Sequence, residues 1–305
     1  MTAPSAESPG FDTISFLTDY GVADEFVGVV KSVIRTISPS VKVIDITHDI
    51  DPHDIRAGGL ALARAAQYLA PGVVLGVVDP GVATDRRPIV IEVGGGQSYL
   101  VGPDNGLFAP AVSMVGGATG AAVLDNSEYH LPSPGPTFDG RDVFGPVAAH
   151  LCNGVPMSEL GTAIDPVKLL PGVLPVSVRD DEDGSVSCEV LWIDRFGNVQ
   201  LNVDPSETED WPDLITVAGG RTTRTAQRVR AFAEIATGSI GVLIDSYGLL
   251  SLAVDQGSAA FELELGEGDS VTLRPSDADA PSVSTRVELQ SRPTTTPPTV
   301  NPEQD

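Results

Sequence analysis

The apolar positions in the first half of the chain predict alternating strands and helices. Residues 73–78, Val-Val-Leu-Gly-Val-Val, are apolar throughout, which is typical of a central strand covered on both faces by helices. Residues 24–38 carry apolar side chains at helical spacing, and Pro39 ends that helix. Further strands are predicted at 14–17, 41–46, 89–93 and 98–101, and a further helix at 54–69. This alternation predicts right-handed crossovers and a largely parallel sheet.

From about residue 185 the pattern changes to short β-rich segments separated by Gly, Pro and Asp. Strands are predicted at 187–193, 198–203, 214–217, 239–244 and 270–273. The predicted fold class is therefore α/β, with an N-terminal, mostly parallel sheet flanked by helices and a smaller C-terminal antiparallel β domain. The expected domains are 12–175 and 185–290, with a boundary near Pro171–Gly184. The polar, low-complexity ends 1–11 and 291–305 are predicted to be disordered tails.

Composition narrows the functional classes. The chain has 305 residues, only 18 Lys and Arg, and a formal net charge of −24, which argues against binding to nucleic acid or an anionic membrane. The first residues have no basic or apolar stretch, and no run of 18 apolar residues occurs, so neither a signal peptide nor a membrane span is expected. Cys152 and Cys188 lie in apolar contexts and are predicted to be reduced core residues. These features predict a cytoplasmic protein.

A carboxylate and a guanidinium follow the strand at 73–78. Asp79 comes directly after it, and Arg86 lies seven residues later across a Gly/Pro turn. In open α/β sheets, ligands bind beyond the carboxyl ends of the strands, so Asp79 is expected at the edge of an active site. An equally simple interpretation is structural: Asp79 caps the turn and pairs with Arg86. This segment alone leaves both interpretations open.

Six segments together resemble one family in their order and spacing. They are Phe16–Gly21, Thr47–Ile50, Val77–Arg87, Gly102–Leu107, Pro136–Pro146 and Ile193–Asn198. The resemblance is to the S-adenosylmethionine (SAM) hydrolases that form adenosine, also called SAM hydroxide adenosyltransferases, which are relatives of SAM-dependent fluorinases and chlorinases. It covers roughly residues 14–260.

The resemblance implies hydrolysis of SAM to adenosine and methionine by attack of water or hydroxide at the ribose C5′. Asp79 would orient the water and accept its proton, Arg86 would stabilise hydroxide character, and Asp139 would be the third group around the water. No metal or redox cofactor is expected, because the sulfonium activates its own carbon and SAM is the substrate.

The resemblance also implies the residues that bind the substrate. Asp19 would bind the two ribose hydroxyls, a bidentate task suited to a carboxylate, although an Asp here is also typical of a turn. The remaining candidates are Asp194 and Asn198 for the methionine ammonium and the nucleoside, Phe196 for adenine stacking, Ser246 for the methionine carboxylate, Tyr247 in the same closing segment, and Ser251 and the Val254 backbone for the purine edge. Phe196 could equally be a core residue. In the family the pocket forms between the N-terminal domain of one subunit and the C-terminal domain of the next, which implies a homotrimer.

The sequence departs from the family pattern at one catalytic position. Hydrolases of the family usually carry His where this chain has Asp139, so two carboxylates are expected to share Arg86, and one of them to hold its proton near neutral pH. We expect Asp139 still to position the water. The alternative is that the site has lost its catalytic activity. His53 also stands where relatives often have an aromatic residue.

Three alternative functions are weighed against hydrolysis. Halogenases carry Tyr at the position of Asp79, and a carboxylate there would repel a halide, so Asp79 argues against halogenation. A non-catalytic SAM or adenosine-binding protein would explain the missing His. A metal-dependent hydrolase is suggested by the ligand types His48, Asp49, Asp51, His53 and Asp54, but their spacing follows no fixed ligand pattern. Thr84, Asp85, Arg87 and Arg141 are assigned structural roles.

Overall fold

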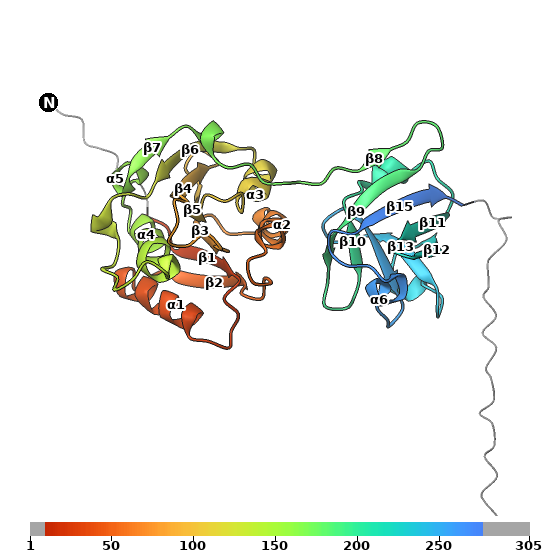
Figure 1. The fold of residues 1–305 in the computed structure, drawn as a ribbon, viewed down its shortest axis with the longest axis horizontal. Coiled ribbons are helices and arrows are strands. Elements are labelled where there is room, and N and C mark those ends of the chain that lie inside the picture. Colours follow the sequence, from red (N-terminus) through yellow and green to blue (C-terminus); the bar gives the residue numbers. More distant parts are fainter. Residues whose placement is uncertain (1–9, 277–305) are drawn as a thin grey trace, which may run out of the picture.

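The chain folds around two separate β-sheets in a computed structural model that describes residues 10–276 (Figure 1). The predicted tail 291–305 and residues 1–9 of the predicted tail 1–11 lie outside the described residues, and so do residues 277–290 of the predicted C-terminal domain. Phe11 is described, and its ring packs edge-on against Tyr99 with centroids 5.8 Å apart. The sequence-based domain limits stay a prediction, but each sheet encloses its own cluster of buried apolar side chains.

The N-terminal part alternates strands and helices at first and then adds strands at one edge. Its strands are β1 Thr13–Thr18, β2 Lys42–Thr47, β3 Val73–Val77, β4 Pro88–Val93, β5 Ser98–Pro103, β6 Ala118–Val123 and β7 Thr162–Ile164. Its helices are α1 Phe26–Ile37, α2 Ile55–Ala66, α3 Ala109–Met114, α4 Gly145–Cys152 and α5 Met157–Leu160, with a π-helix, η2, at Gly140–Phe144.

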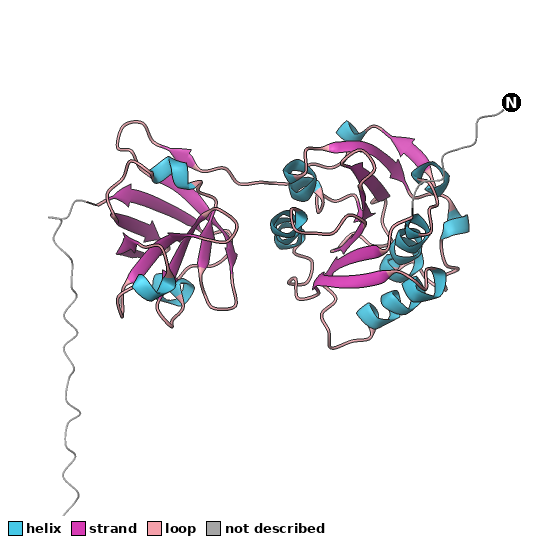
Figure 2. Ribbon diagram, turned by 180° about the vertical axis from the view of Figure 1, so that it is seen from behind, coloured by secondary structure: helices cyan, strands magenta, loops and turns pink. Residues whose placement is uncertain are grey.

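The seven strands lie in the order β2-β1-β3-β5-β4-β6-β7, with helices on both faces (Figure 2). Successive side chains of β1 point to opposite faces. Ile14 and Phe16 pack with residues of α1 and α4, whereas Leu17 packs with residues of α2 and α3. This three-layer arrangement confirms the α/β class and explains why β3 is apolar at every position.

The sheet is parallel in one half only. The pairs β2–β1, β1–β3 and β3–β5 are parallel, and the pairs from β5 to β7 are antiparallel. The physical reason is the short turn Gly94-Gly95-Gly96-Gln97 between β4 and β5, because so short a connection can join only antiparallel neighbours. All three glycines have positive φ, the conformation that favours this residue type.

The C-terminal part is a closed, mostly antiparallel barrel, as the β-rich pattern predicted. Its strands are β8 Val178–Arg179, β9 Val186–Ile193, β10 Val199–Leu201, β11 Leu214–Gly219, β12 Thr222–Arg228, β13 Ile240–Ile244, β14 Leu250–Val254 and β15 Ser270–Pro275, with helix α6 at Ala259–Leu263. Pairing of β9 with β10 closes the ring, and only β12 and β13 run parallel. Strands β8, β12 and β14 were not predicted. The residues of β12, Thr-Thr-Arg-Thr-Ala-Gln-Arg, bury one side chain only, Ala226, whereas β14 is buried at all but its last position.

An extended segment without helix or strand, residues 169–177, connects the two parts (Figure 1). Helix α2 faces the barrel: Arg56 pairs with Glu189 of β9, and the guanidinium of Arg64 lies 4.2 Å from the ring centroid of Trp192. Cys152 and Cys188 are free thiols buried in different apolar clusters, and burial raises the pKa of each to about 12. No helix within residues 10–276 has the length and apolar character that crossing a membrane requires.

Candidate active site

Two carboxylates lie side by side at the carboxyl edge of the parallel half of the sheet. Strands β1 and β3 are parallel neighbours, and their last paired residues are Thr18 and Val77. Asp19 follows the first strand directly, and Asp79 follows the second after one further residue. Asp19 and Asp79 both line a cavity of about 270 Å³. The strand pairing thus brings together two candidates that are 60 residues apart in the sequence.

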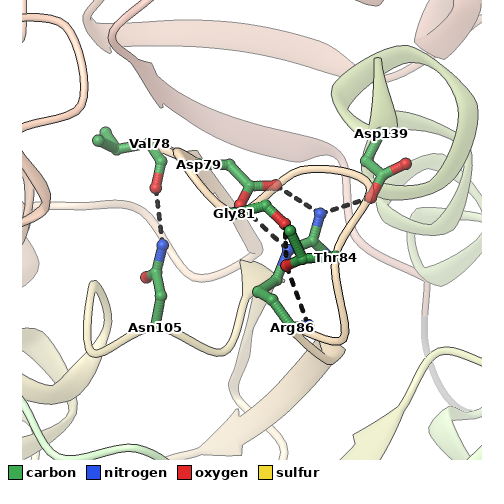
Figure 3. A network of polar contacts seen from close by, with 7 residues as sticks. All are labelled: Val78, Asp79, Gly81, Thr84, Arg86, Asn105 and Asp139. Carbon is green, nitrogen blue, oxygen red and sulfur yellow. Dashed lines mark hydrogen bonds and ion pairs between the residues drawn. The ribbon is translucent and has the colours of Figure 1, made fainter. Parts of the chain in front are cut away.

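Arg86 links Asp79 to Asp139 (Figure 3). Its Nε donates to Asp79 Oδ1 at 3.0 Å and its Nη2 to Asp79 Oδ2 at 2.5 Å. The same Nη2 donates to Asp139 Oδ2 at 2.5 Å. All three side chains are largely buried. One guanidinium therefore binds both carboxylates. Asp79 and Asp139 line the cavity and Arg86 does not, so Arg86 lies behind the two acids as seen from the cavity.

Asp139 reaches the site from a distant segment of the chain. It stands directly before the π-helix, which continues into α4, the helix that covers one face of β1 and β3. Next to it, Arg141 pairs with buried Asp142 and lies over the ring of Phe138 at 5.0 Å. These contacts fix the loop that presents Asp139.

Further polar contacts fix the end of β3. Asn105 Nδ2 donates to the carbonyl of Val78 at 2.9 Å, directly before Asp79. Buried Asp104 accepts from Arg87 and, at 2.9 Å, from the backbone N of Leu170. Within the turn, Thr84 Oγ1 donates to the carbonyl of Gly81 at 2.6 Å. These side chains support the site and do not line its cavity.

Burial dominates the electrostatics of Asp79. Desolvation raises the pKa of this carboxyl above its usual value, against the opposing effect of Arg86, and the negative charge of Asp139 raises it further. Arg86 compensates one negative charge of the pair but not both. Asp79 is therefore a stronger base than an exposed aspartate.

Tyr20 is a site residue that the sequence analysis did not single out. Its side chain lines the same cavity, and its ring packs against Phe26 and Phe138, with centroids 5.7 and 5.8 Å away. Its position directly after Asp19 was the available signal. In the sequence alone, an aromatic residue at a strand end equally indicates ordinary packing.

Asp19 is held by backbone and neighbouring contacts. Its Oδ2 accepts from the backbone N of His53 at 2.9 Å, where His53 adopts a positive φ of 71°. Just before it, Thr18 Oγ1 lies 2.8 Å from Nδ1 of buried His48, whose Nε2 lies 3.1 Å from Asp45. His48 Nδ1 is therefore paired with Thr18, and Nε2 lies beside Asp45 without a hydrogen bond among the described residues. Among residues 10–276, no group of three or more His, Cys, Asp or Glu side chains is arranged to hold a metal ion.

The C-terminal candidates gather at a different cavity, of about 420 Å³, on the barrel. It is lined by Asp194, Asn198, Ser246, Tyr247 and Ser251. Asp194 stabilises the turn at residues 194–198. Its carboxylate accepts hydrogen bonds from the backbone N of Phe196 and of Asn198 at 2.9 Å each, and from Asn198 Nδ2 at 2.8 Å. No residue lines both this cavity and the one at Asp79.

Two predicted binding residues lie outside the barrel cavity. Phe196 stands at the tip of the Asp194 turn and is 73% exposed, so it is not a core residue. Val254 ends β14, and its carbonyl accepts from Gly257 N at 3.3 Å. Binding of adenine by Phe196 and by the Val254 backbone stays a prediction.

Eight further residues line the barrel cavity and were not among the predicted site residues: Trp192, Gln200, Arg230, Ala231, Phe232, Leu243, Ile244 and Asp245. Gln200 is 2% exposed, and its Oε1 has no hydrogen-bond partner among the described residues. A usable signal was its position two residues after Asn198 in the predicted strand 198–203, which would place both side chains on one face; in the structure Asn198 directly precedes β10.

Fold and site together define a two-part α/β and β-barrel protein with a buried Asp–Arg–Asp cluster at the strand ends. The family described as SAM hydroxide adenosyltransferase matches with both of its domains, the N-terminal one at residues 14–161 and the C-terminal one at 188–272. The chain belongs to this family.

Similar proteins agree with this assignment. A protein of Salinispora tropica named (R)-S-adenosyl-L-methionine hydrolase is 43% identical over 260 residues, which cover 85% of this chain and 97% of that protein. A solved structure of an uncharacterised conserved protein from Thermotoga maritima has a TM-score of 0.78 and 37% identity, covering 86% of this chain and 99% of the other. A fluorinase of Actinoplanes sp. is more distant, with 25% identity over 295 residues, or 87% of this chain and 98% of the fluorinase.

Proposed function

We propose that the protein hydrolyses SAM to adenosine and L-methionine. The observation that carries this proposal is the buried bridge from Arg86 to both Asp79 and Asp139, beside Asp19 at the end of the neighbouring strand. The relatives named as SAM hydrolases support the same activity.

The reaction is a displacement at the ribose C5′. Water forms the new C5′–O bond, the C5′–S bond breaks with its electron pair going to sulfur, and methionine leaves as a neutral thioether. The water proton passes to Asp79, whose raised pKa suits it to accept a proton better than an exposed aspartate would. Arg86 holds the two acids in place and offsets part of their charge.

Substrate binding is proposed to use both cavities. Asp19 binds the ribose hydroxyls beside Asp79, and Asn198 and Ser246 bind the nucleoside and amino-acid ends. These groups line two cavities that share no residue. The separation supports a homotrimer in which the N-terminal cavity of one subunit meets the barrel cavity of the next.

The alternatives predict different products. A halide beside Asp79 would meet two carboxylates that share one guanidinium, and the negative charge left over disfavours halogenation. A sensor would bind SAM and return it unchanged. We propose that no metal or other cofactor takes part, and the cytoplasmic location stays a prediction from the sequence.

The test is incubation of the pure protein with each sulfonium epimer of SAM, with and without chloride, followed by chromatography. Adenosine and methionine in equal amounts are expected, with preference for the (R) epimer that names the relatives. EDTA should leave the rate unchanged. Asp79→Asn should lower kcat by about 10²-fold or more, since it removes the proton acceptor. Intact SAM of both epimers would contradict the proposal, and 5′-chloro-5′-deoxyadenosine would support the halogenase instead.

A further inference from the structure

The hydroxyl of Tyr20 lies inside the carboxylate cluster. A Cβ atom built on Gly140 would stand 2.3 Å from Tyr20 Oη, so the hydroxyl occupies the space beside the residue that follows Asp139. The negative charges of Asp19, Asp79 and Asp139 all act on this phenol. The side chain therefore reaches from the end of β1 to the start of the π-helix as part of the cavity wall.

The phenol keeps its proton in this environment. Burial raises the pKa of Tyr20 far above its usual value, and Asp19, Asp79 and Asp139 raise it further, against the opposing effect of Arg86. No described residue accepts a hydrogen bond from Tyr20 Oη, although Asp19, Asp79 and Asp139 line the same cavity. The hydroxyl is thus a neutral donor without a protein partner.

The attacking water needs such a donor. Its two hydrogens can be donated to Asp79 and Asp139, two of the three acids that line the cavity, and one lone pair must face C5′. The other lone pair requires a hydrogen-bond donor to fix the direction of attack. Arg86 does not line the cavity, and its Nε and Nη2 already donate to the carboxylates.

Few other donors stand in the cavity wall. Besides Tyr20, only His53 and Thr137 among its lining residues carry donor side chains, and both are exposed. Of these three, Tyr20 is the one whose hydroxyl lies beside Gly140, next to Asp139, and the charges of Asp79 and Asp139 both act on it. We propose that Tyr20 Oη donates a hydrogen bond to the attacking water, and afterwards to the 5′-hydroxyl of adenosine, a role that rests on the proposed SAM hydrolysis.

This role would compensate for the departure at position 139. The family resemblance places His there, and an imidazole can donate a hydrogen bond, whereas an ionised Asp only accepts. With Asp139 present, the donor comes from Tyr20. Tyr20→Phe, which keeps the ring and its packing, removes only this donor.

The first experiment measures binding of two nucleosides by calorimetry, because it does not depend on turnover. Adenosine and 5′-deoxyadenosine differ only in the hydroxyl that Tyr20 would contact. The wild-type protein should bind adenosine about 3- to 10-fold more tightly, and Tyr20→Phe should lose most of this preference while binding 5′-deoxyadenosine as before. Tyr99→Phe is the matched control, since it removes a hydroxyl that faces Glu92 outside the site.

The second experiment measures SAM hydrolysis. Tyr20→Phe should lower kcat by about 10-fold or more with little change in KM, and Tyr20→Phe combined with Asp139→His should recover much of that loss because the imidazole supplies a donor. An unchanged nucleoside preference together with an unchanged kcat in Tyr20→Phe would overturn this role and leave the proposed hydrolysis standing. Failure of the wild-type protein both to bind adenosine and to hydrolyse SAM would overturn the proposed function, and this role with it.

Discussion

Arg86 Nη2 donates to Asp139 Oδ2 at 2.5 Å, joining residues 53 positions apart in the sequence. The same nitrogen donates to Asp79, so the two acids share one cation in a largely buried setting. Asp139 therefore supplies a second acceptor, where the family resemblance leads one to expect an imidazole. The protonation of this pair should govern how activity and stability depend on pH.

Asp139→Asn should move the acid limb of the pH profile to lower pH. Burial raises the pKa of Asp79, and the charge of Asp139 raises it further, so activity that needs ionised Asp79 rises with pH above the ordinary range of an aspartate. Removing the second charge lowers that pKa. The measurement is kcat/KM between pH 4 and 8, with Asp85→Asn in the exposed turn as the control; an acid limb that does not move would contradict this account.

Arg86→Met should destabilise the protein in a pH-dependent way. Removing the cation leaves two carboxylates together in a largely buried site, which costs about 3 kcal/mol at neutral pH. Because a raised folded-state pKa means that protonation favours the folded state, the cost should be greatest at pH 7 and shrink as pH falls towards 4. Urea denaturation at several pH values measures it. A cost that grows towards acid pH would refute the reasoning.

Gly140→Ala should impair catalysis through Tyr20. The new Cβ would stand 2.3 Å from Tyr20 Oη, so the hydroxyl must move, and kcat should fall about as far as in Tyr20→Phe. In Tyr20→Phe the same change should add little, although Cζ at 3.2 Å leaves a tight contact. A double-mutant cycle of kcat tests this coupling. Fully additive losses would show that the two positions act separately.

Mixing two inactive variants should restore hydrolysis if sites form between subunits. Asp79→Asn disables the N-terminal cavity, and Ser246→Trp fills the barrel cavity. A mixed oligomer can combine an intact cavity of each kind at some of its interfaces. The activity of the two variants after co-refolding is the readout, and mass photometry gives the subunit number. No recovery in a mixed oligomer would place the complete site within one chain.

Local sequence patterns were enough to identify most elements. The wholly apolar segment 73–78 marked the central strand, and helical spacing over 24–38 marked α1. The antiparallel pairing of the later strands was not predicted, although the glycine turn at 94–97 indicated it. The parallel arrangement inferred from the earlier alternation of strands and helices was applied to these strands as well. Strand β12 lacked a signal altogether, since closure of the barrel, and not burial of its own side chains, holds it in place.

The sequence by itself determined the two-part architecture, the family resemblance and the acids at the strand ends, because these depend on periodicity and on residues within short segments. The family resemblance also led to the expectation that Asp79 and Asp139 share Arg86, as they do in the structure. Only the tertiary structure decided that Tyr20 lies beside Gly140 and that most of the barrel candidates line a separate cavity. Each of these relationships joins segments through strand pairing or helix packing. Such contacts depend on how distant parts of the chain bury their apolar surfaces together, which no local pattern of residues specifies.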